Sequence, residues 1–559
     1  MFSPDNILAY IKFFLNCYVW ILPCVCIYLA VSCLQEHQFS IEDPKHRYDD
    51  IKAKFFYETH VGASYRITIM SIILILFSTY TGLFHVYRLN FSYYGYLLVT
   101  INFNLDKLWY LAIAQISISI ALYFYTQNLD FERMRNQKHD RRSPHCCFYF
   151  LYKIYYLHTF VHALFMLEGT ATFLILYGVV TLWIFRITGV FQKKPFTYKT
   201  IYGIHFILIP ALLFFISGRS CFYLPIEISL PIEIAGTTSV VISDQDTAIY
   251  LLFFLYFATG LGLFPFHNWL FKVHAESTTE GSIVLSGVLT PISIYGITNY
   301  CKEFFPIVDA APYILPVTLI GAVVAAFSMF WRRNSDIKKI IVYSSVLQVN
   351  MAIWILVTCP ESFLKFFSAF SFTHALSYAG LFCAVGHLDN TLKTRNLLEL
   401  SGIGQYMPSV WSFSFLILMN TAILPNAAAL PTAAGFWSPH QFMMLLLSQR
   451  ESTPYIFYSF LAPVVIFYLI NFYICARLWS RTSSDYIESY ISTSFEESSQ
   501  ITISYKIGRI LFFTCFFSVF NIDELIAKAL LVIGYIFLWY IKIRWTWTYK
   551  NSVYQNNEN

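Results

Sequence analysis

Glu168 and His374 are ionisable side chains inside long apolar runs of this sequence, where charge is costly. Glu168 falls in the run 159–187, and His374 falls in the run 364–388. An ionisable group at membrane depth usually belongs to a proton or ion pathway, and histidine exchanges protons near neutral pH. The alternative is that both side chains are neutral, hydrogen-bonded groups that only help helices to pack. The residue types therefore predict proton transfer, with packing as the competing interpretation.

A second group of candidates follows an interruption in another apolar run. The stretch 260–266 contains two glycines and a proline, and His267, His274 and Glu276 come directly after it. Proline removes a helical hydrogen bond, and loosened backbone at membrane depth survives only where it is buried in protein or lines a wet cavity. These three side chains are therefore predicted to border an ion path. The alternative is a solvated loop end.

A similar interruption occurs at 424–431, which contains Pro425 and Pro431. Counted along the apolar runs, the two interruptions fall in helices seven and twelve. Broken helices at matching positions of two halves are typical of transporters built from inverted repeats, with the ion path at the break. Two ordinary proline kinks are the alternative, but the matching positions favour the transporter.

The sequence lacks the patterns of redox, nucleotide and metal sites. It contains no GxGxxG or GxxxxGK[ST] motif, and its 12 cysteines include no CxxC pair. We therefore expect no flavin, haem, iron–sulfur cluster or catalytic metal on this chain. A membrane enzyme is the weaker alternative, because no nucleophile constellation is visible, and a conduit for ions is the stronger one.

The elements that must position these residues are membrane helices. The chain has 559 residues, of which 57% are hydrophobic and 12% are charged, whereas soluble domains carry about 25% charged residues. The sequence predicts an all-α polytopic membrane protein of about fourteen transmembrane helices, with a fifteenth left open. The apolar runs are 7–33, 66–87, 105–126, 143–158, 159–187, 199–218, 247–266, 281–299, 312–331, 339–358, 364–388, 408–449, 455–480, 506–521 and 524–544.

Charge alternates between the connecting loops. Basic residues gather in the loops around 45–54, 133–142 and 332–333, while the loop 221–246 is acidic. Positive charge stays on the side from which a membrane protein is inserted, so the basic loops are predicted to share one face. The net charge of +5 is explained by this topology, and no nucleic-acid partner is expected.

Several motifs resemble one family. The stretch from Pro265 to Leu285 reads PFHNWLFKVHAESTTEGSIVL and is similar to the signature of the chain 4 family of antiporter-like subunits in mitochondrial NADH–ubiquinone oxidoreductase, respiratory complex I. The stretches 335–346, 373–382 and 397–408 resemble the same family, and Glu168 matches its fifth-helix glutamate. The resemblance covers about residues 90–480.

The resemblance implies a fourteen-helix, antiporter-like fold that carries protons in the membrane arm of complex I. It implies N-terminal helices and loops at 1–142, repeats at 143–300 and 301–480, and C-terminal helices at 481–559. Related chains 2 and 5 and lipids are the implied partners. NADH, FMN, iron–sulfur clusters and ubiquinone are expected in other subunits, and the implied location is the mitochondrial inner membrane.

The composition favours an organelle gene. The chain has 55 Phe and 41 Tyr, whose codons are AT-rich, and its N-terminal residues do not have the Arg-rich pattern of a presequence. We therefore expect this chain to be encoded in the organelle.

Some of the family's working residues are missing. Gly260 and Pro291 stand where the resemblance places lysines on helices seven and eight, and His440 is the nearest titratable group to the helix-twelve acid. The predicted proton path therefore comprises Glu168, His267, His374 and His440, with His274 and Glu276 as the loop signature. Two alternatives remain: a structural subunit with a degenerate, non-conducting path, and a free-standing cation/proton antiporter subunit.

Overall fold

The structure is a computed structural model that describes part of the chain. The described residues are 22–35, 58–70, 73, 87–93, 96–103, 105–127, 144–167, 169–188, 208–209, 244–301, 307–330, 335–358, 360–397, 399–400, 403, 410–411 and 414. Glu168, His440, the interruption at 424–431 and most of the charged loops that define the predicted topology lie outside them. Predictions for those residues remain predictions.

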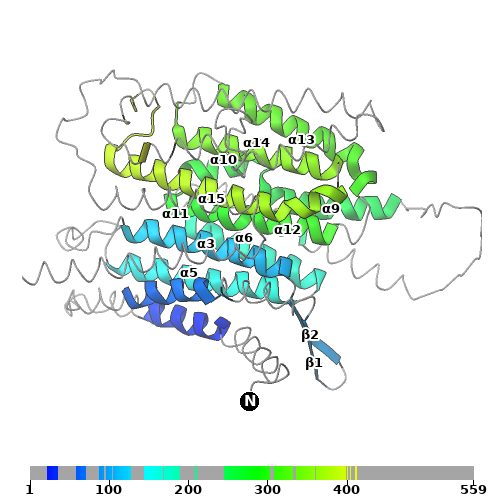
Figure 1. Cartoon of the computed structure of the whole chain (residues 1–559), viewed down its shortest axis with the longest axis horizontal. Helices are drawn as coiled ribbons and strands as arrows, with labels where there is room; N and C mark the ends of the chain where they lie inside the picture. The colour runs from blue at the N-terminus through cyan, green and yellow to red at the C-terminus, as the bar shows by residue number, and fades with distance from the viewer. Residues whose placement is uncertain are drawn as a thin grey trace, which may run out of the picture.

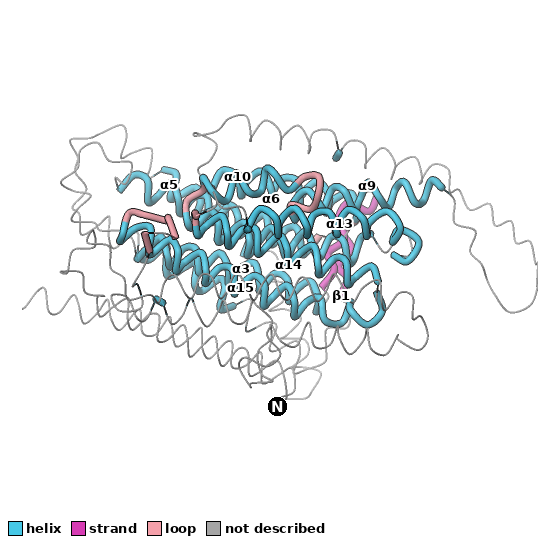
Figure 2. Tube along the Cα trace, turned by 90° about the horizontal axis from the view of Figure 1, so that it is seen from above, coloured by secondary structure: helices cyan, strands magenta, loops and turns pink. Residues whose placement is uncertain are grey.

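Helices make up most of the described structure and run side by side along its longest dimension (Figures 1 and 2). Residues 22–35 and 58–70 are helical as well. The helices are α3 Leu105–Gln127, α5 Pro144–Met166, α6 Thr170–Thr188, α9 Asp244–Leu261, α10 His267–Glu276, α11 Thr279–Val284, α12 Thr290–Gly296, α13 Ile307–Phe330, α14 Ile337–Thr358 and α15 Pro360–Leu392, with π-helical segments η1 Leu285–Leu289 and η2 Ile297–Cys301.

Within the part that the structure describes, three helical stretches are long and apolar enough to cross a membrane: Lys107–Thr126, Thr170–Thr188 and Thr279–Tyr300. The last consists of α11, η1, α12 and η2 in unbroken succession, and its apolar window is 100% buried inside the protein. In contrast, α13 exposes large apolar side chains such as Val323 and Phe327, at 60% and 61%. Exposed apolar faces of this kind suit contact with lipid. The helices thus divide into enclosed and outward-facing ones, as expected of a membrane protein.

The chain leaves helical geometry between α9 and α10, where the first interruption was predicted. Gly262 has φ +66°, a left-handed conformation that favours glycine, and a Cβ atom there would collide with Leu270. The Phe264–Pro265 peptide bond is cis. Helix α10 then begins at His267.

Two features of the fold differ from the sequence prediction. The all-α prediction missed an antiparallel hairpin, β1 Tyr87–Tyr93 paired with β2 Tyr96–Phe103. These strands are rich in aromatic and β-branched residues, which favour strands. The predicted spans 143–158 and 159–187 were divided wrongly, because α5 continues to Met166 and α6 begins only at Thr170.

The division between α5 and α6 has a local cause. Gly169 has φ +117°, which L side chains rarely adopt, and its carbonyl accepts the first hydrogen bond of α6 from Phe173 N at 2.9 Å. The two helices then pack antiparallel, with Trp183 Nε1 donating to the Lys153 carbonyl at 2.8 Å. Hydropathy alone could not place this boundary, since apolar residues continue across it.

Candidate functional site

The position predicted to have lost the helix-seven lysine is filled by other side chains. A Cβ atom at Gly260 would overlap the Tyr177 hydroxyl and Ser293 Oγ. These two oxygens are hydrogen-bonded to each other at 2.8 Å, and Ser293 Oγ also donates to the Leu289 carbonyl at 2.8 Å. A lysine side chain therefore has no space at residue 260 in this packing.

Aromatic rings surround the hydrogen-bonded pair Tyr177 and Ser293. The Tyr177 ring lies 5.1 Å from that of Tyr256 and 5.2 Å from that of Phe257, both in edge-to-face contact. The Tyr256 hydroxyl donates to the Leu174 carbonyl at 3.1 Å. We call Tyr177, Tyr256, Phe257, Gly260 and Ser293 the packed region; within it, each of the three hydroxyl groups has a hydrogen-bond partner.

Pro291, at the second lysine position, is also buried. It lies near the start of α12, directly after the π-helical segment η1, and its neighbours Ile292 and Ser293 are fully buried. The structure thus places neither charge nor water-facing surface at this position.

His267 and His274 lie on α10 and are both buried, with 8% and 4% of their surface exposed. The His267 ring stacks on Phe264 at 5.6 Å, and the His274 ring stacks on Phe382 of α15 at 5.2 Å. Among the described residues, no group hydrogen-bonds to Nδ1 of either ring. The loop-end interpretation of these two histidines is therefore wrong, because aromatic packing encloses them.

His374 lies on α15 and faces α14. Its Nε2 is 3.2 Å from Ser345 Oγ, and its ring is 4.5 Å from that of Tyr378. The Tyr378 hydroxyl is in turn 3.0 Å from Ser344 Oγ. His374 is therefore held by a hydroxyl-lined contact between two helices, which suits packing and proton transfer alike.

Glu276, the other loop-signature residue, is half-buried at the end of α10. It borders a groove of about 210 Å³ with Lys272 and Lys339, next to the contacting rings of Phe271 and Tyr343. The structure brings His274 and Glu276 onto one short helix, packed against α14. Glu168 and His440 lie outside the described residues, so the predicted path as a whole remains a prediction.

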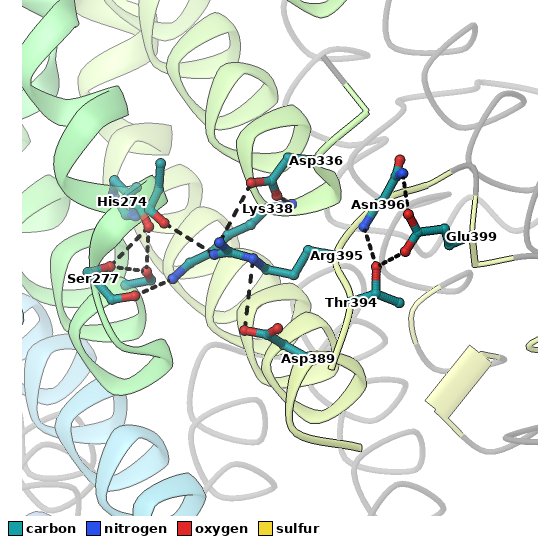
Figure 3. Close-up of polar contacts among 11 residues, drawn as sticks. His274, Ser277, Asp336, Lys338, Asp389, Thr394, Arg395, Asn396 and Glu399 are labelled. Carbon is teal, nitrogen blue, oxygen red and sulfur yellow. Dashed lines mark hydrogen bonds and ion pairs between the residues drawn. The ribbon is translucent and has the colours of Figure 1, made fainter. Parts of the chain in front are cut away.

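Sequence reasoning missed a polar cluster at the end of α10 (Figure 3). It comprises the side chains of Lys338, Arg395, Asp336 and Asp389 and the carbonyls of Ala275 and Ser277. Lys338, in the first turn of α14 and 4% exposed, donates its Nζ hydrogen to the Ser277 carbonyl at 2.7 Å. Arg395 Nη1 donates to the Ala275 carbonyl at 3.2 Å. Carbonyls at a helix C-terminus lack intrahelical partners and attract cations. These two cations therefore cap the C-terminus of α10 and connect it to α14 and to the segment after α15.

Two carboxylates position Arg395 in this cluster. Its guanidinium group lies 3.9 Å from Asp336 and 3.9 Å from Asp389 (Figure 3). Asp336 Oδ1 also accepts the Lys338 backbone N–H at 2.9 Å, which caps α14. The sequence held a signal for this cluster, since Lys338 belongs to a family-like motif, but the partners are 61 and 120 residues apart.

The segment after α15 carries one carboxyl with a shifted pKa. Glu399 accepts hydrogen bonds from the Thr394 hydroxyl and from Asn396 Nδ2, the latter at 2.7 Å. These two donors stabilise the ionised form and hold the pKa of Glu399 below its usual value. These hydrogen bonds join residues within 394–399, the segment that carries Arg395 (Figure 3).

No set of three or more His, Cys, Asp or Glu side chains could hold a metal ion in the described segments. The groups described above are imidazoles, hydroxyl groups, carboxylates and the cations Lys338 and Arg395. These groups can bind water and pass protons.

Comparison with known proteins identifies the relatives of this chain. The sequence model of a family described as the transmembrane family of NADH:quinone oxidoreductase and Mrp antiporters matches residues 146–464. NADH-ubiquinone oxidoreductase chain 4 from Chondrus crispus is 32% identical over 162 residues, covering 29% of this chain and 32% of the relative. The protein of the same name from Acanthamoeba castellanii is 27% identical over 257 residues, covering 45% and 50%. The matches span half or less of these relatives.

Solved structures share the fold at low sequence identity. A chain of the Mrp complex from Dietzia has a TM-score of 0.62 and 12% identity, covering 86% of this chain and 85% of that one. A chain of respiratory complex I from Thermus thermophilus has a TM-score of 0.57 and 12% identity, covering 91% and 99%. At this identity the likeness establishes the antiporter-like membrane fold.

Proposed function

The chain belongs to the transmembrane family of NADH:quinone oxidoreductase and Mrp antiporters, and we propose that it is a membrane-arm subunit of respiratory complex I that contributes to proton translocation. The observation that supports this proposal is the family match over 146–464, which contains the packed region and the polar cluster. Relatives named NADH-ubiquinone oxidoreductase chain 4 point to complex I within the family.

The finer parts of the proposal follow from the same membership. The repeats would occupy 143–300 and 301–480, with helices seven and twelve broken and segments 1–142 and 481–559 flanking them. Chains 2 and 5 would be neighbours in the inner mitochondrial membrane. NADH, FMN, the iron–sulfur clusters and ubiquinone would be bound by other subunits, and this chain would bind none of them.

Affinity purification tests this assignment. The tagged chain is isolated in mild detergent, its partners are identified by mass spectrometry, and NADH:ubiquinone reductase activity is measured. We expect NADH-oxidising subunits together with chains 2 and 5. Recovery with Mrp-type subunits alone, combined with sodium-dependent proton exchange and no NADH oxidation, would instead establish the free-standing antiporter.

The packed region favours one second candidate, a structural subunit whose family route is silent. Glu168 would lack a lysine partner from position 260, because Tyr177 and Ser293 occupy that space. In this case Glu168→Gln complexes assemble and keep their proton-to-electron ratio. Loss of coupled turnover in an assembled Glu168→Gln complex would exclude the silent route.

A further inference from the structure

A second group of buried polar side chains lies away from the packed region, between helix 58–70, α3 and α5. We define the polar ladder as the six residues Ser64, Thr68, Gln115, Ser119, His158 and His162. Each has at most 1% of its surface exposed. The three helices lie next to one another on the N-terminal side of the bundle (Figure 1). No residue of the ladder belongs to the path predicted from the family resemblance.

Three hydrogen bonds between side chains connect the helices through the ladder. Ser64 Oγ is 2.9 Å from His158 Nε2, and Thr68 Oγ1 is 2.7 Å from Ser119 Oγ. Gln115 Nε2 donates to His162 Nδ1 at 2.9 Å. Each helix thus contributes polar groups to at least one bond with a neighbour.

The ladder extends along the helix axes. Ser64 and Thr68 are one turn apart on their helix, as are His158 and His162 on α5. One turn further, the Tyr155 hydroxyl donates to the His60 carbonyl at 2.5 Å. From His60 to Thr68 the rise is about 12 Å, at about 1.5 Å per residue. This is a substantial part of a hydrocarbon core of about 30 Å.

Two atoms of the ladder have unused hydrogen-bonding capacity. His158 Nδ1 and Gln115 Oε1 have no hydrogen-bond partner among the residues that the structure describes, although both side chains are 0% exposed. An unsatisfied buried polar atom costs about 1–3 kcal/mol, and buried water commonly satisfies such atoms. Both atoms can bond a water molecule directly.

We propose that the polar ladder binds water and forms a proton relay separate from the route through positions 260 and 291. This inference rests on the proposed proton-translocating function. In the relay, a proton taken up at one imidazole nitrogen is matched by release of a proton from the other. Each histidine is neutral again after one passage, and rotation of its ring then restores the starting tautomer.

The histidines of the ladder differ from His267 and His274 in their surroundings. Those two rings are stacked on phenylalanines, whereas His158 and His162 are hydrogen-bonded to a hydroxyl and an amide of other helices. His158 and His162 therefore each have a hydrogen-bonded polar group of a neighbouring helix to or from which a proton can pass.

The relay is tested with the assembled complex in liposomes. His158→Gln and His162→Gln keep one hydrogen-bonding group but cannot accept and release protons as imidazole does. We expect both variants to oxidise NADH at the wild-type rate with uncoupler present and to move fewer protons per NADH. The matched control is Ser117→Ala, a buried serine of α3 outside the ladder that bonds only its own helix at Ile113. It should leave the ratio unchanged.

The outcomes separate this inference from the function on which it rests. An unchanged proton-to-NADH ratio in both histidine variants overturns the relay while the proposed function stands. A wild-type complex that oxidises NADH without moving protons overturns the function instead. If a variant fails to assemble, a high-resolution map of the wild-type complex decides. Water within hydrogen-bond distance of His158 Nδ1 and Gln115 Oε1 supports the relay, and protein partners at both atoms exclude it.

Discussion

The packed region and the polar ladder are both buried where helices meet, but they differ in how fully their polar atoms are hydrogen-bonded. In the packed region, the Tyr177 and Ser293 hydroxyls bond each other and aromatic rings fill the remaining space. In the ladder, His158 and Gln115 each keep one side-chain atom, Nδ1 and Oε1, without a hydrogen-bond partner among the described residues. The position where the family resemblance places a lysine is thus densely packed, while titratable groups occur at the other site.

The comparison shows why a missing residue is weak evidence about function by itself. The absence of lysine at position 260 would be compatible with a water-filled gap that preserves a path. Tyr177 removes that possibility by filling the space with its ring and hydroxyl. The replacement of lysine by glycine has therefore left no gap at position 260 in this packing.

The largest expected effect is overpacking at position 260. Gly260→Ala forces a Cβ atom into the Tyr177 and Ser293 oxygens, and it should lower the free energy of unfolding by about 3 kcal/mol. Unfolding of the full chain by SDS in mixed micelles measures this change. Combining Gly260→Ala with Tyr177→Phe and Ser293→Ala removes both oxygens and should recover part of the loss. A stable Gly260→Ala protein would mean that the packed region is loose.

A smaller loss is expected when the ladder loses a hydroxyl. Ser64→Ala removes the partner of His158 Nε2, so neither ring nitrogen keeps a hydrogen bond from the described residues. The free energy of unfolding should fall by about 2 kcal/mol in the same micelle assay. Ser117→Ala, which loses only a bond within its own helix, serves as the reference. Equal effects of the two substitutions would contradict the interhelical role of Ser64.

Loss of the Tyr177 hydroxyl in the packed region should lower the free energy of unfolding less than loss of the Ser64 hydroxyl in the ladder. Tyr177→Phe keeps the ring contacts, and Ser293 Oγ retains its bond to the Leu289 carbonyl. The expected cost is about 1 kcal/mol, the net value of one ordinary hydrogen bond. If Tyr177→Phe costs more than Ser64→Ala, the two regions do not differ in the way described above.

The smallest loss of stability is expected for Arg395→Gln in the polar cluster, and it provides a reference for the changes in the packed region and the ladder. Arg395→Gln weakens ion pairs of 3.9 Å made by a side chain that is 33% exposed. Partly exposed pairs contribute less than about 1 kcal/mol, and salt reduces that contribution. Thermal unfolding of the variant and the wild-type protein should therefore converge as salt concentration rises. A difference that persists at high salt would assign the effect to the hydrogen bond with Ala275.

Composition along the chain was sufficient to predict the membrane class. Apolar runs and scarce charge require helices in lipid, and the glycines and proline of 260–266 mark the place where α9 ends. The boundary between α5 and α6 was not predictable by the same reasoning. It depends on the conformation of Gly169, which leaves no trace in hydropathy.

The sites were harder to predict than the fold. His60 and Ser64 lie in a stretch that reads as a polar loop before the apolar run 66–87, yet residues 58–70 are helical and pack against α5. Tyr177 reads as an ordinary aromatic residue of a membrane helix, and only its approach to Gly260 reveals its role. Both features arise from pairings more than 80 residues apart, which a single sequence does not encode locally.

The stretch Thr279–Tyr300 contains two π-helical segments, and its apolar window is enclosed by protein on every side. Each π-turn accommodates about one extra residue and rotates the following part of the helix. On a surface helix such a rotation would turn the lipid-facing side chains toward the interior. A helix with no outer face has no such orientation to preserve. It must instead keep its packing: a Cβ atom at Gly287 would collide with Ser117 and one at Gly296 with Phe257, so a gained or lost residue would disturb the contacts beyond it.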